Sequence, residues 1–324
     1  MLGRNTSQVC IADMFAAQRR LRRILPSSPM LDMAPLNTEL GHQVYLKAES
    51  LLPTGSFKIR GGYNKICCLM EQYGRDIEVI TASSGNHGMA VALSSRMAGI
   101  KATVAVPAST PAMKKACIAS FGAQILEYGS TYDETYPYAY RTAEERGIYY
   151  VHSTSDADIL GGQGTISLEV LEQMPDLEQI IVPLGGGGLV SGIAYAMKTL
   201  RPGVSVIAVM PEQSCVYAAC RRAGRVVELE KAGSVADAVV KKTIEEYLYP
   251  YIESYVDDIL TVREDSIRRA VKTAALYAKC VLEGAGGLAL AAVLEGQIDL
   301  DKKTVIVFSG GNIDQAVLTE CLNR

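Results

Sequence analysis

Short runs of apolar and β-branched residues alternate with segments of helical periodicity along almost the whole chain. The expected strands are 44–47, 78–82, 102–106, 124–128, 148–151, 179–183, 205–210, 257–262 and 304–308. Several of these runs are apolar at nearly every position, which is typical of strands that are covered on both faces.

In segments between these runs, apolar residues recur on one face of an expected helix. The two clearest follow Lys58 and Gly188, with apolar positions at 59, 63, 66 and 70 in the first and at 189, 193, 197 and 200 in the second. These spacings repeat with the period of an α-helix. Strand and helix in alternation predict an α/β fold with mainly parallel sheets.

The composition is that of an ordinary globular protein. Of the 324 residues, 48% are hydrophobic and 21% are charged, and the formal net charge is −3. This balance gives no reason to expect nucleic acid or an anionic membrane as a partner. No apolar run approaches the roughly 18 residues of a membrane-spanning helix. We therefore expect a protein that works without nucleic acid or membrane.

The N-terminal segment is basic, with Arg19, Arg20, Arg22 and Arg23 close together. A basic arm or a transit segment would have this composition, but we favour the solvated face of an N-terminal helix. No secretory signal is visible.

The cysteines give no sign of a disulfide scaffold or a zinc site. There are eight, none of them in a Cys-x-x-Cys pair, and no histidine stands at zinc-ligand spacing beside them. We expect reduced thiols that serve mostly as small core residues, and a cytoplasmic protein.

Three glycine-rich turns each follow an expected strand. Their ranges are 83–88, 185–188 and 309–312. In open α/β sheets, ligands gather beyond the carboxyl ends of the strands, where helix N-termini offer unpaired N–H groups. The three turns are therefore candidate binding elements.

The turn of Gly185, Gly186, Gly187 and Gly188 has no side chain at any position. Such a backbone can wrap a phosphate without steric hindrance from a Cβ atom. It does not meet the nucleotide-binding fingerprints, because the spacing is not Gly-x-Gly-x-x-Gly and no Gly-Lys-Ser/Thr follows. The alternative is a tight strand-to-helix connection that needs glycine only for close packing.

The turn from Ser83 to Gly88 offers hydroxyls and backbone amides before a helix that we expect to start near Met89. That arrangement suits a carboxylate. Alternatively, Ser84 or Asn86 is simply the N-cap of the helix.

The chain has three histidines, His42, His87 and His152. None belongs to a recognisable nucleophile–base arrangement, so a Ser-His-Asp hydrolase is a weak interpretation.

Lys58 stands where a loop containing Pro53 and Gly55 enters an expected helix. A lysine at such an entry is often a solvated surface charge. If it points inward instead, its amine loses a proton more readily and becomes a nucleophile for a carbonyl. The residues around Lys58 leave both alternatives open.

Taken together, these segments resemble the fold type II pyridoxal-phosphate enzymes, and among them the serine/threonine dehydratase and serine racemase branch. The likeness runs from about Val44 to Asp314. The motifs that carry it are Thr54-Gly55-Ser56-Phe57-Lys58-Ile59-Arg60-Gly61, Ser84-Gly85-Asn86-His87, Gly162-Gln163-Gly164-Thr165, Gly185–Leu189, Glu283-Gly284-Ala285-Gly286 and Ser309-Gly310-Gly311-Asn312.

The resemblance implies where pyridoxal 5′-phosphate is held. Lys58 would bind it as a Schiff base, and Phe57 would lie against its pyridine ring. Asn86 would bond the ring hydroxyl, and the backbone of Gly185, Gly186, Gly187, Gly188 and Leu189 would cradle the phosphate. Ser309 would face the pyridine nitrogen.

The resemblance also implies how substrate is bound. Ser83, Ser84, Gly85, Asn86 and His87 would clasp its carboxylate. Lys58, once released, would move the α-proton on one face, and Ser84 would act as acid or base on the opposite face.

The activity implied by the resemblance is that of an ammonia-lyase, which converts a small hydroxy-amino acid such as L-threonine or L-serine to a 2-oxo acid and ammonia. An electron sink at Cα suits this elimination. The alternative is a serine or aspartate racemase on the same scaffold. A β-replacement synthase and a non-catalytic protein that only binds the cofactor are further candidates, both ranked lower.

Two segments depart from the family pattern. Met210 takes the place of the first carboxylate of the racemases' divalent-metal site, and a thioether is a poor ligand for a hard cation, so we expect no metal. The segment His152-Ser153-Thr154-Ser155-Asp156 replaces the usual His-Pro-aromatic-acidic run near the substrate, which leaves the side-chain preference open.

By the same resemblance we expect two domains and a homodimer. Residues 1–51 and 152–324 would form a large cofactor-binding domain, and 52–151 a small mobile substrate domain.

Overall fold

The computed structural model describes residues 4–324, which form two compact units. The smaller unit contains the described residues up to Pro26 together with Phe57–Gln163, and the larger contains Ser27–Ser56 and Gly164–Arg324. The sequence placed the domain changes after residues 51 and 151 and gave the N-terminal segment to the large domain. The roles assigned to the two domains stay predictions.

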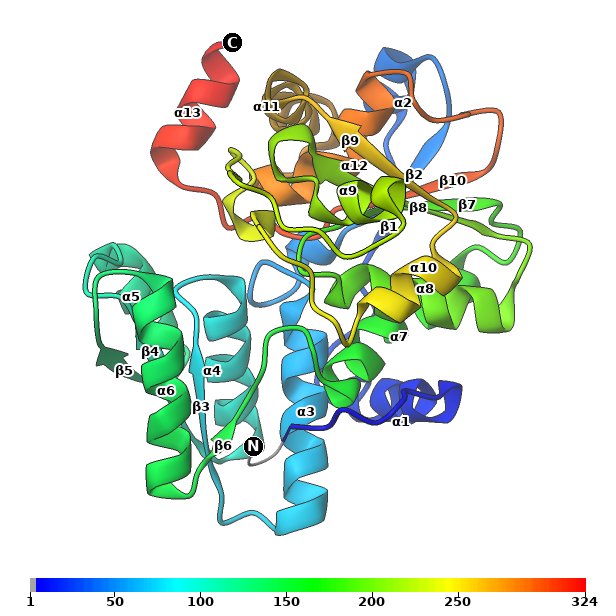
Figure 1. Ribbon diagram of the computed structural model, residues 1–324. Helices are drawn as coiled ribbons and strands as arrows, with labels where there is room; N and C mark the ends of the chain where they lie inside the picture. The colour runs from blue at the N-terminus through cyan, green and yellow to red at the C-terminus, as the bar shows by residue number, and fades with distance from the viewer. Residues whose placement is uncertain (1–3) are drawn as a thin grey trace. The chain divides into compact units, whose positions relative to one another are not determined.

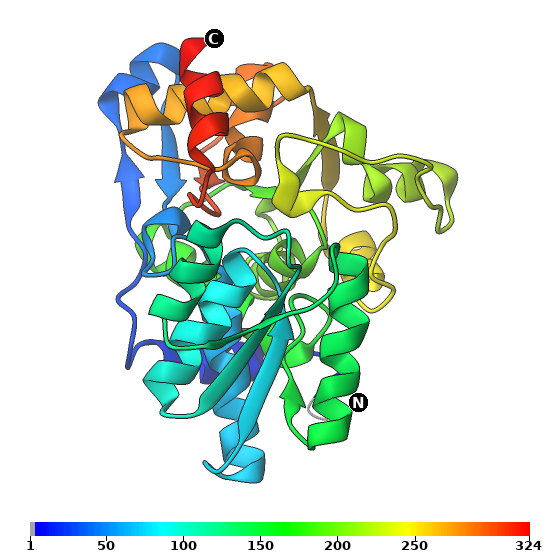
Figure 2. The same ribbon diagram turned by 90° about the vertical axis from the view of Figure 1, so that its left-hand side faces the viewer.

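The smaller unit is built on a four-stranded parallel sheet in the order β5-β4-β3-β6. Figure 2 shows β3 and β4 side by side and pointing the same way. The elements of this unit are α1(Ile11–Leu21), α3(Lys58–Tyr73), β3(Glu78–Ala82), α4(Asn86–Ala98), β4(Lys101–Val106), α5(Ala112–Ser120), β5(Gln124–Glu127), α6(Tyr132–Arg146), β6(Tyr149–Tyr150) and the first turns of α7(Ala157–Gln173).

Helices cover both faces of this sheet. Val79 and Val104 face a core shared with α3, α4 and α5. Their strand neighbours Ile80 and Ala105 face a second core shared with α6. Successive side chains of a strand point to opposite faces, so strands covered on both sides need apolar residues throughout, as these have.

The larger unit has a six-stranded sheet in the order β1-β2-β10-β7-β8-β9. All neighbours are parallel except β1 and β2, which are antiparallel. The elements are β1(Met30–Asp32), α2(Ala34–Leu40), β2(Val44–Lys47), η1(Glu49–Leu51), β7(Gln179–Pro183), α8(Gly188–Leu200), β8(Ser205–Pro211), η2(Glu212–Ser214), α9(Val216–Ala223), η3(Asp237–Val239), α10(Tyr249–Tyr255), β9(Asp258–Val262), α11(Glu264–Thr273), η4(Ala274–Ala278), α12(Gly284–Leu294), β10(Thr304–Val307) and α13(Gln315–Asn323).

The central strands of this unit are buried on both faces. Ile181, Val209 and Ile306 point into a core with α11 and α12. Ile180 and Val182 alternate with Ile181 along β7 and are buried on the opposite face of the sheet. In Figure 1, α8 and α12 lie on opposite sides of this sheet. The expected α/β class with mainly parallel sheets is confirmed.

Strand ends agree closely with the expectation. Residues 44–47, 78–82 and 179–183 are strands with the expected ends, and the other six expected strands differ by one residue at one or both ends. The sequence missed β1, a three-residue strand at the edge of the larger sheet.

Three findings bear on expectations about the cysteines, the membrane and the N-terminal segment. All eight cysteines are free thiols, three of them buried. Across residues 4–324, no helix has the length and apolar character to cross a membrane. A helix does form over Ile11–Leu21, as favoured; Arg19 and Arg20 lie in its last turn, and Arg22 is its C-cap.

Candidate active site

Lys58 is the first residue of α3, and its amine points into the smaller unit. Its Nζ donates a hydrogen bond to the carbonyl oxygen of Ser153 at 2.9 Å. It also lies 5.2 Å from the centre of the Phe57 ring. Of the two alternatives, the structure shows the inward one: the side chain is half-buried and its amine is held by a backbone carbonyl.

The turn before α4 brings several backbone amides together. α4 begins at Asn86, not near Met89, and Gly85 is its N-cap, so neither Ser84 nor Asn86 caps it. The chain turns tightly here because Gly88 has no Cβ, which would lie 2.3 Å from the Ser83 carbonyl oxygen. The first N–H groups of a helix have no acceptor within the helix itself, which makes this end of α4 suited to an anion.

The two serines of this turn are both partly buried. Ser83 Oγ accepts the N–H of Gly85 at 3.3 Å, which stabilises the turn itself. The Ser84 side chain is half-buried. The Ser83 hydroxyl therefore has a structural role in the turn, which its position in the sequence did not reveal.

The imidazole of His87 is buried and bonded to the backbone. Its Nε2 lies 3.1 Å from the carbonyl oxygen of Val151. A carbonyl only accepts, so Nε2 carries the hydrogen. Burial, followed by the positive charge of Lys58, lowers the pKa of His87 to about 3. The ring is neutral at neutral pH, and His87 can offer an incoming carboxylate its backbone N–H.

The segment after β6 is folded around His152. Its Nδ1 accepts the N–H groups of Thr154 at 3.1 Å and Ser155 at 2.9 Å. This turn presents the carbonyl of Ser153 to Lys58. The sequence showed only that the segment departs from the family pattern, because a backbone acceptor leaves no residue signal.

The four-glycine turn of the larger unit lies between β7 and α8. Gly187 is the N-cap of α8 with φ of 95°, a conformation that L side chains rarely adopt. A Cβ at Gly187 would lie 2.9 Å from Tyr217 Oη, and one at Gly185 would lie 2.7 Å from Val239 Cβ. Packing thus explains glycine at both positions, while the N–H groups at the start of α8 remain suited to a phosphate.

Ser309 follows β10 and is nearly buried. The next residue, Gly310, forms a β-bridge with Ser56. Asn312 Nδ2 donates to the Thr54 carbonyl oxygen at 2.8 Å. The turn that contains Ser309 therefore holds the loop from which the chain passes directly into Phe57 and Lys58.

These residues fit pyridoxal phosphate. Its aldehyde requires an amine held in a defined position, which Lys58 provides. Its phosphate requires a backbone that offers N–H groups with no Cβ in the way, and the turn at Gly185 and Gly187 has that form. A chain without the Lys58 amine could not bind the aldehyde covalently, and one without the glycine turn would lack the backbone N–H groups for the phosphate.

Comparison with known proteins identifies the family. Residues 23–310 match the family described as "Pyridoxal-phosphate dependent enzyme". The chain belongs to this family. The predicted resemblance and the predicted cofactor, pyridoxal 5′-phosphate, are therefore confirmed, and the protein is an enzyme of this class.

Two curated relatives and one solved structure are similar to this chain over most of their length. An L-threonine ammonia-lyase of Thermotoga maritima is 39% identical over 98% of this chain and 79% of its own length. An L-threonine dehydratase, catabolic TdcB, of Escherichia coli K12 is 35% identical over 94% of both chains. A maize serine racemase structure has a TM-score of 0.89 at 31% identity and covers 98% of each chain.

Proposed function

We propose that this pyridoxal-phosphate enzyme deaminates L-threonine, L-serine or a close β-hydroxy relative. Elimination breaks the Cα–H and Cβ–O bonds and releases water. Hydrolysis of the resulting enamine then takes up one water and breaks the Cα–N bond, which gives a 2-oxo acid and ammonia. The observation that carries the proposal is the 39% identity to an L-threonine ammonia-lyase over 98% of this chain. The family motifs of the sequence are present in both units.

We assign the proton transfer at Cα to Lys58. When bound, the cofactor supplies an electron sink next to Cα. The carbonyl of Ser153 accepts a hydrogen from the Lys58 amine and so holds the amine in a defined position. An amine with one hydrogen fixed by an acceptor is a better-oriented base than a freely rotating one.

The remaining roles follow the same proposal. The segment from Ser83 to His87 would bind the substrate carboxylate at the start of α4. Phe57 and Asn86 would contact the cofactor ring, and Gly185 to Leu189 its phosphate. Ser309 would face the ring nitrogen. A neutral hydroxyl there holds a proton on that nitrogen less firmly than a carboxylate would.

The experiment compares Lys58→Ala with the wild type and with Lys101→Ala, a surface lysine paired to Glu78. Lys58→Ala should release no 2-oxo acid from L-threonine or L-serine and should lack the visible absorption of covalently attached cofactor. Lys101→Ala should match the wild type. An active Lys58→Ala enzyme would refute the proposal.

Racemisation is the second candidate, favoured by the likeness to a maize serine racemase. Both activities begin with removal of the α-proton, and Ser84 is our candidate for returning it on the other face. Chiral chromatography of serine and aspartate from the same incubations distinguishes racemisation from deamination. Ser84→Ala should abolish racemisation, and persistence of racemisation in that variant would exclude a two-base mechanism through Ser84.

We further propose that the enzyme is a cytoplasmic homodimer that needs no metal. Free thiols at all eight cysteines support a reducing compartment. The homodimer is inferred from the family resemblance. Within residues 4–324, no group of three or more metal-binding side chains is found, and activity that survives dialysis against a chelator would support the expectation.

A further inference from the structure

Two lysines on one face of α3 contact the same segment of the smaller unit. Lys58 and Lys65 are seven residues apart, which is close to two turns of an α-helix. Lys58 Nζ donates to the Ser153 carbonyl. Lys65 Nζ lies 2.9 Å from Asp156 Oδ2 and 2.7 Å from Asp158 Oδ2. The segment 153–158 is thus held by both lysines.

The contact at Lys65 is buried. The Lys65 and Asp156 side chains are 1% and 0% exposed. Burial opposes the charge on Lys65, but Asp156 and Asp158 outweigh it and raise the pKa of Lys65. Burial raises the pKa of Asp156, and Lys65 acts against this. A buried pair of this kind is costly to break, because the remaining partner stays charged without water.

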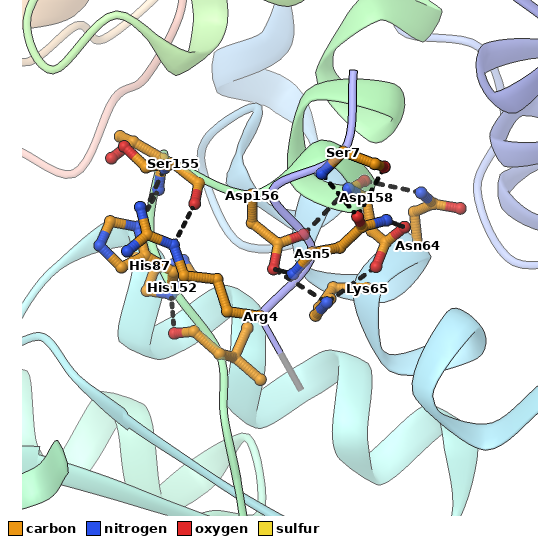
Figure 3. A network of polar contacts seen from close by, with 12 residues as sticks. Arg4, Asn5, Ser7, Asn64, Lys65, His87, His152, Ser155, Asp156 and Asp158 are labelled. Carbon is orange, nitrogen blue, oxygen red and sulfur yellow. Dashed lines mark hydrogen bonds and ion pairs between the residues drawn. The ribbon is translucent and has the colours of Figure 1, made fainter. Parts of the chain in front are cut away.

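The N-terminal segment binds the same two carboxylates as Lys65, as Figure 3 shows. The backbone N–H of Asn5 donates to Asp156 Oδ2, and Asn5 Nδ2 donates to Asp158 Oδ1, both at 3.0 Å. Arg4 Nε donates to the Ser155 carbonyl at 2.8 Å. Asp156 Oδ1 accepts the N–H of Asp158 at 2.9 Å.

These contacts leave the Ser153 carbonyl little freedom. It lies between His152, whose Nδ1 holds the N–H groups of Thr154 and Ser155, and the fixed carboxylate of Asp156. A shift of Asp156 would therefore rotate the turn and move the acceptor of the Lys58 amine. Misplacement of a reacting group by about 1 Å can cost about a hundredfold in rate.

We propose that Lys65 is a positioning residue of this enzyme: through Asp156 and Asp158 it fixes the Ser153 carbonyl that orients the amine of Lys58. The inference rests on the proposed role of Lys58 in the reaction. It assigns a function to a buried lysine that does not itself touch the reacting atoms.

The test compares Lys65→Met with Lys47→Met. Lys47 is a matched control, because it is 0% exposed and pairs with Glu169 at 2.7 Å in the larger unit. Both variants should lose comparable stability. Only Lys65→Met should lower kcat, by about tenfold, with KM changed less than about twofold, since it disturbs the orientation of a base.

Hydrogen–deuterium exchange supplies a readout that does not depend on activity. In Lys65→Met, the peptide that contains residues 152–158 should exchange at least about tenfold faster than in the wild type, whereas Lys47→Met should leave it unchanged. Lys65→Arg keeps the charge and should restore slow exchange and most of kcat.

Equal kcat and equal exchange in Lys65→Met and the wild type would overturn the inference. So would a fall in kcat of the same size in Lys47→Met, because the loss of activity would then follow from lost stability alone.

If Lys65→Met does not fold, Asp156→Asn takes its place, since it keeps an oxygen for the Asp158 N–H and leaves Lys65 paired with Asp158. If the wild type releases no 2-oxo acid, the proposed function fails, and the exchange comparison still tests the positioning.

Discussion

The buried imidazole of His87 gives the smaller unit a specific sensitivity to acid. Its pKa is lowered from 6.5 to about 3, first by burial and then by Lys58. Between these values the unfolded chain binds a proton at His87 and the folded chain does not. The stability that the neutral ring contributes is therefore complete above pH 6.5 and is lost as the pH falls toward 3, by about 1.4 kcal/mol per pH unit.

His87→Gln should remove this dependence. We expect the free energy of unfolding of the wild type to fall more steeply between pH 6.5 and 5 than that of the variant, by about 1.4 kcal/mol per unit. Urea denaturation of both proteins at several pH values in this range measures the two slopes. Parallel slopes would mean that His87 is protonated in the folded protein, against the burial that the structure shows.

At the scale of helices, α12 and the turn after β10 approach each other too closely for side chains. A Cβ at Gly286 would lie 2.1 Å from the carbonyl oxygen of Gly310, the residue after Ser309. Backbone atoms at this distance cannot move aside without shifting the turn. The neighbouring Gly287 is different, since its added Cβ would lie 3.4 Å from the Cβ of Ala270.

Gly286→Ala and Gly287→Ala form a matched pair on the same helix. We expect Gly286→Ala to lower the free energy of unfolding by about 1–3 kcal/mol and to weaken cofactor retention, because the turn containing Ser309 must shift. Gly287→Ala should be neutral or stabilising by up to about 1 kcal/mol, since alanine is the better helix former. Denaturation midpoints and cofactor loss on dialysis distinguish them, and equal behaviour of the two would contradict the close approach.

The elements were predictable where apolar runs defined them. The residues of β7 are all buried, and the sequence identified both ends of that strand. β1 was missed because it has only three residues, none of them buried, at an antiparallel edge. The start of α4 was placed too late because Gly85, which caps it without a side-chain bond, carries no capping signal.

The candidate site was predictable in its residues but not in its contacts. The motif around Lys58 pointed to a nucleophilic lysine, yet its inward direction depends on Ser153, a partner 95 residues later in the chain. The pairing of Lys65 with Asp156 likewise joins residues that are far apart in the sequence. Contacts of this kind arise from tertiary packing, which neither periodicity nor local motifs encode.

For the whole molecule, the proposed homodimer can be tested on the larger unit's surface. Val281 is 51% exposed and Leu51 is 55% exposed. The chain segments that carry them come close at Gly311, whose added Cβ would meet the Val281 carbonyl oxygen and the side chain of Ser50, the residue before Leu51. Contiguous exposed apolar residues mark surfaces that another chain covers, so we take the surface that carries Val281 and Leu51, called here the Val281 patch, as the place to test the homodimer.

If this patch lies in the homodimer interface, Val281→Glu should yield a monomer, because burying an unpaired carboxylate costs several kcal/mol. Val226 is also 51% exposed and serves as the matched control, since Val226→Glu adds the same charge on the segment after α9. Analytical ultracentrifugation of the three proteins at one concentration should give a dimer for the wild type and the control and half that mass for Val281→Glu. A dimeric Val281→Glu protein would place the interface elsewhere, and a monomeric wild type would remove the homodimer altogether while leaving the assignment of Lys58 intact.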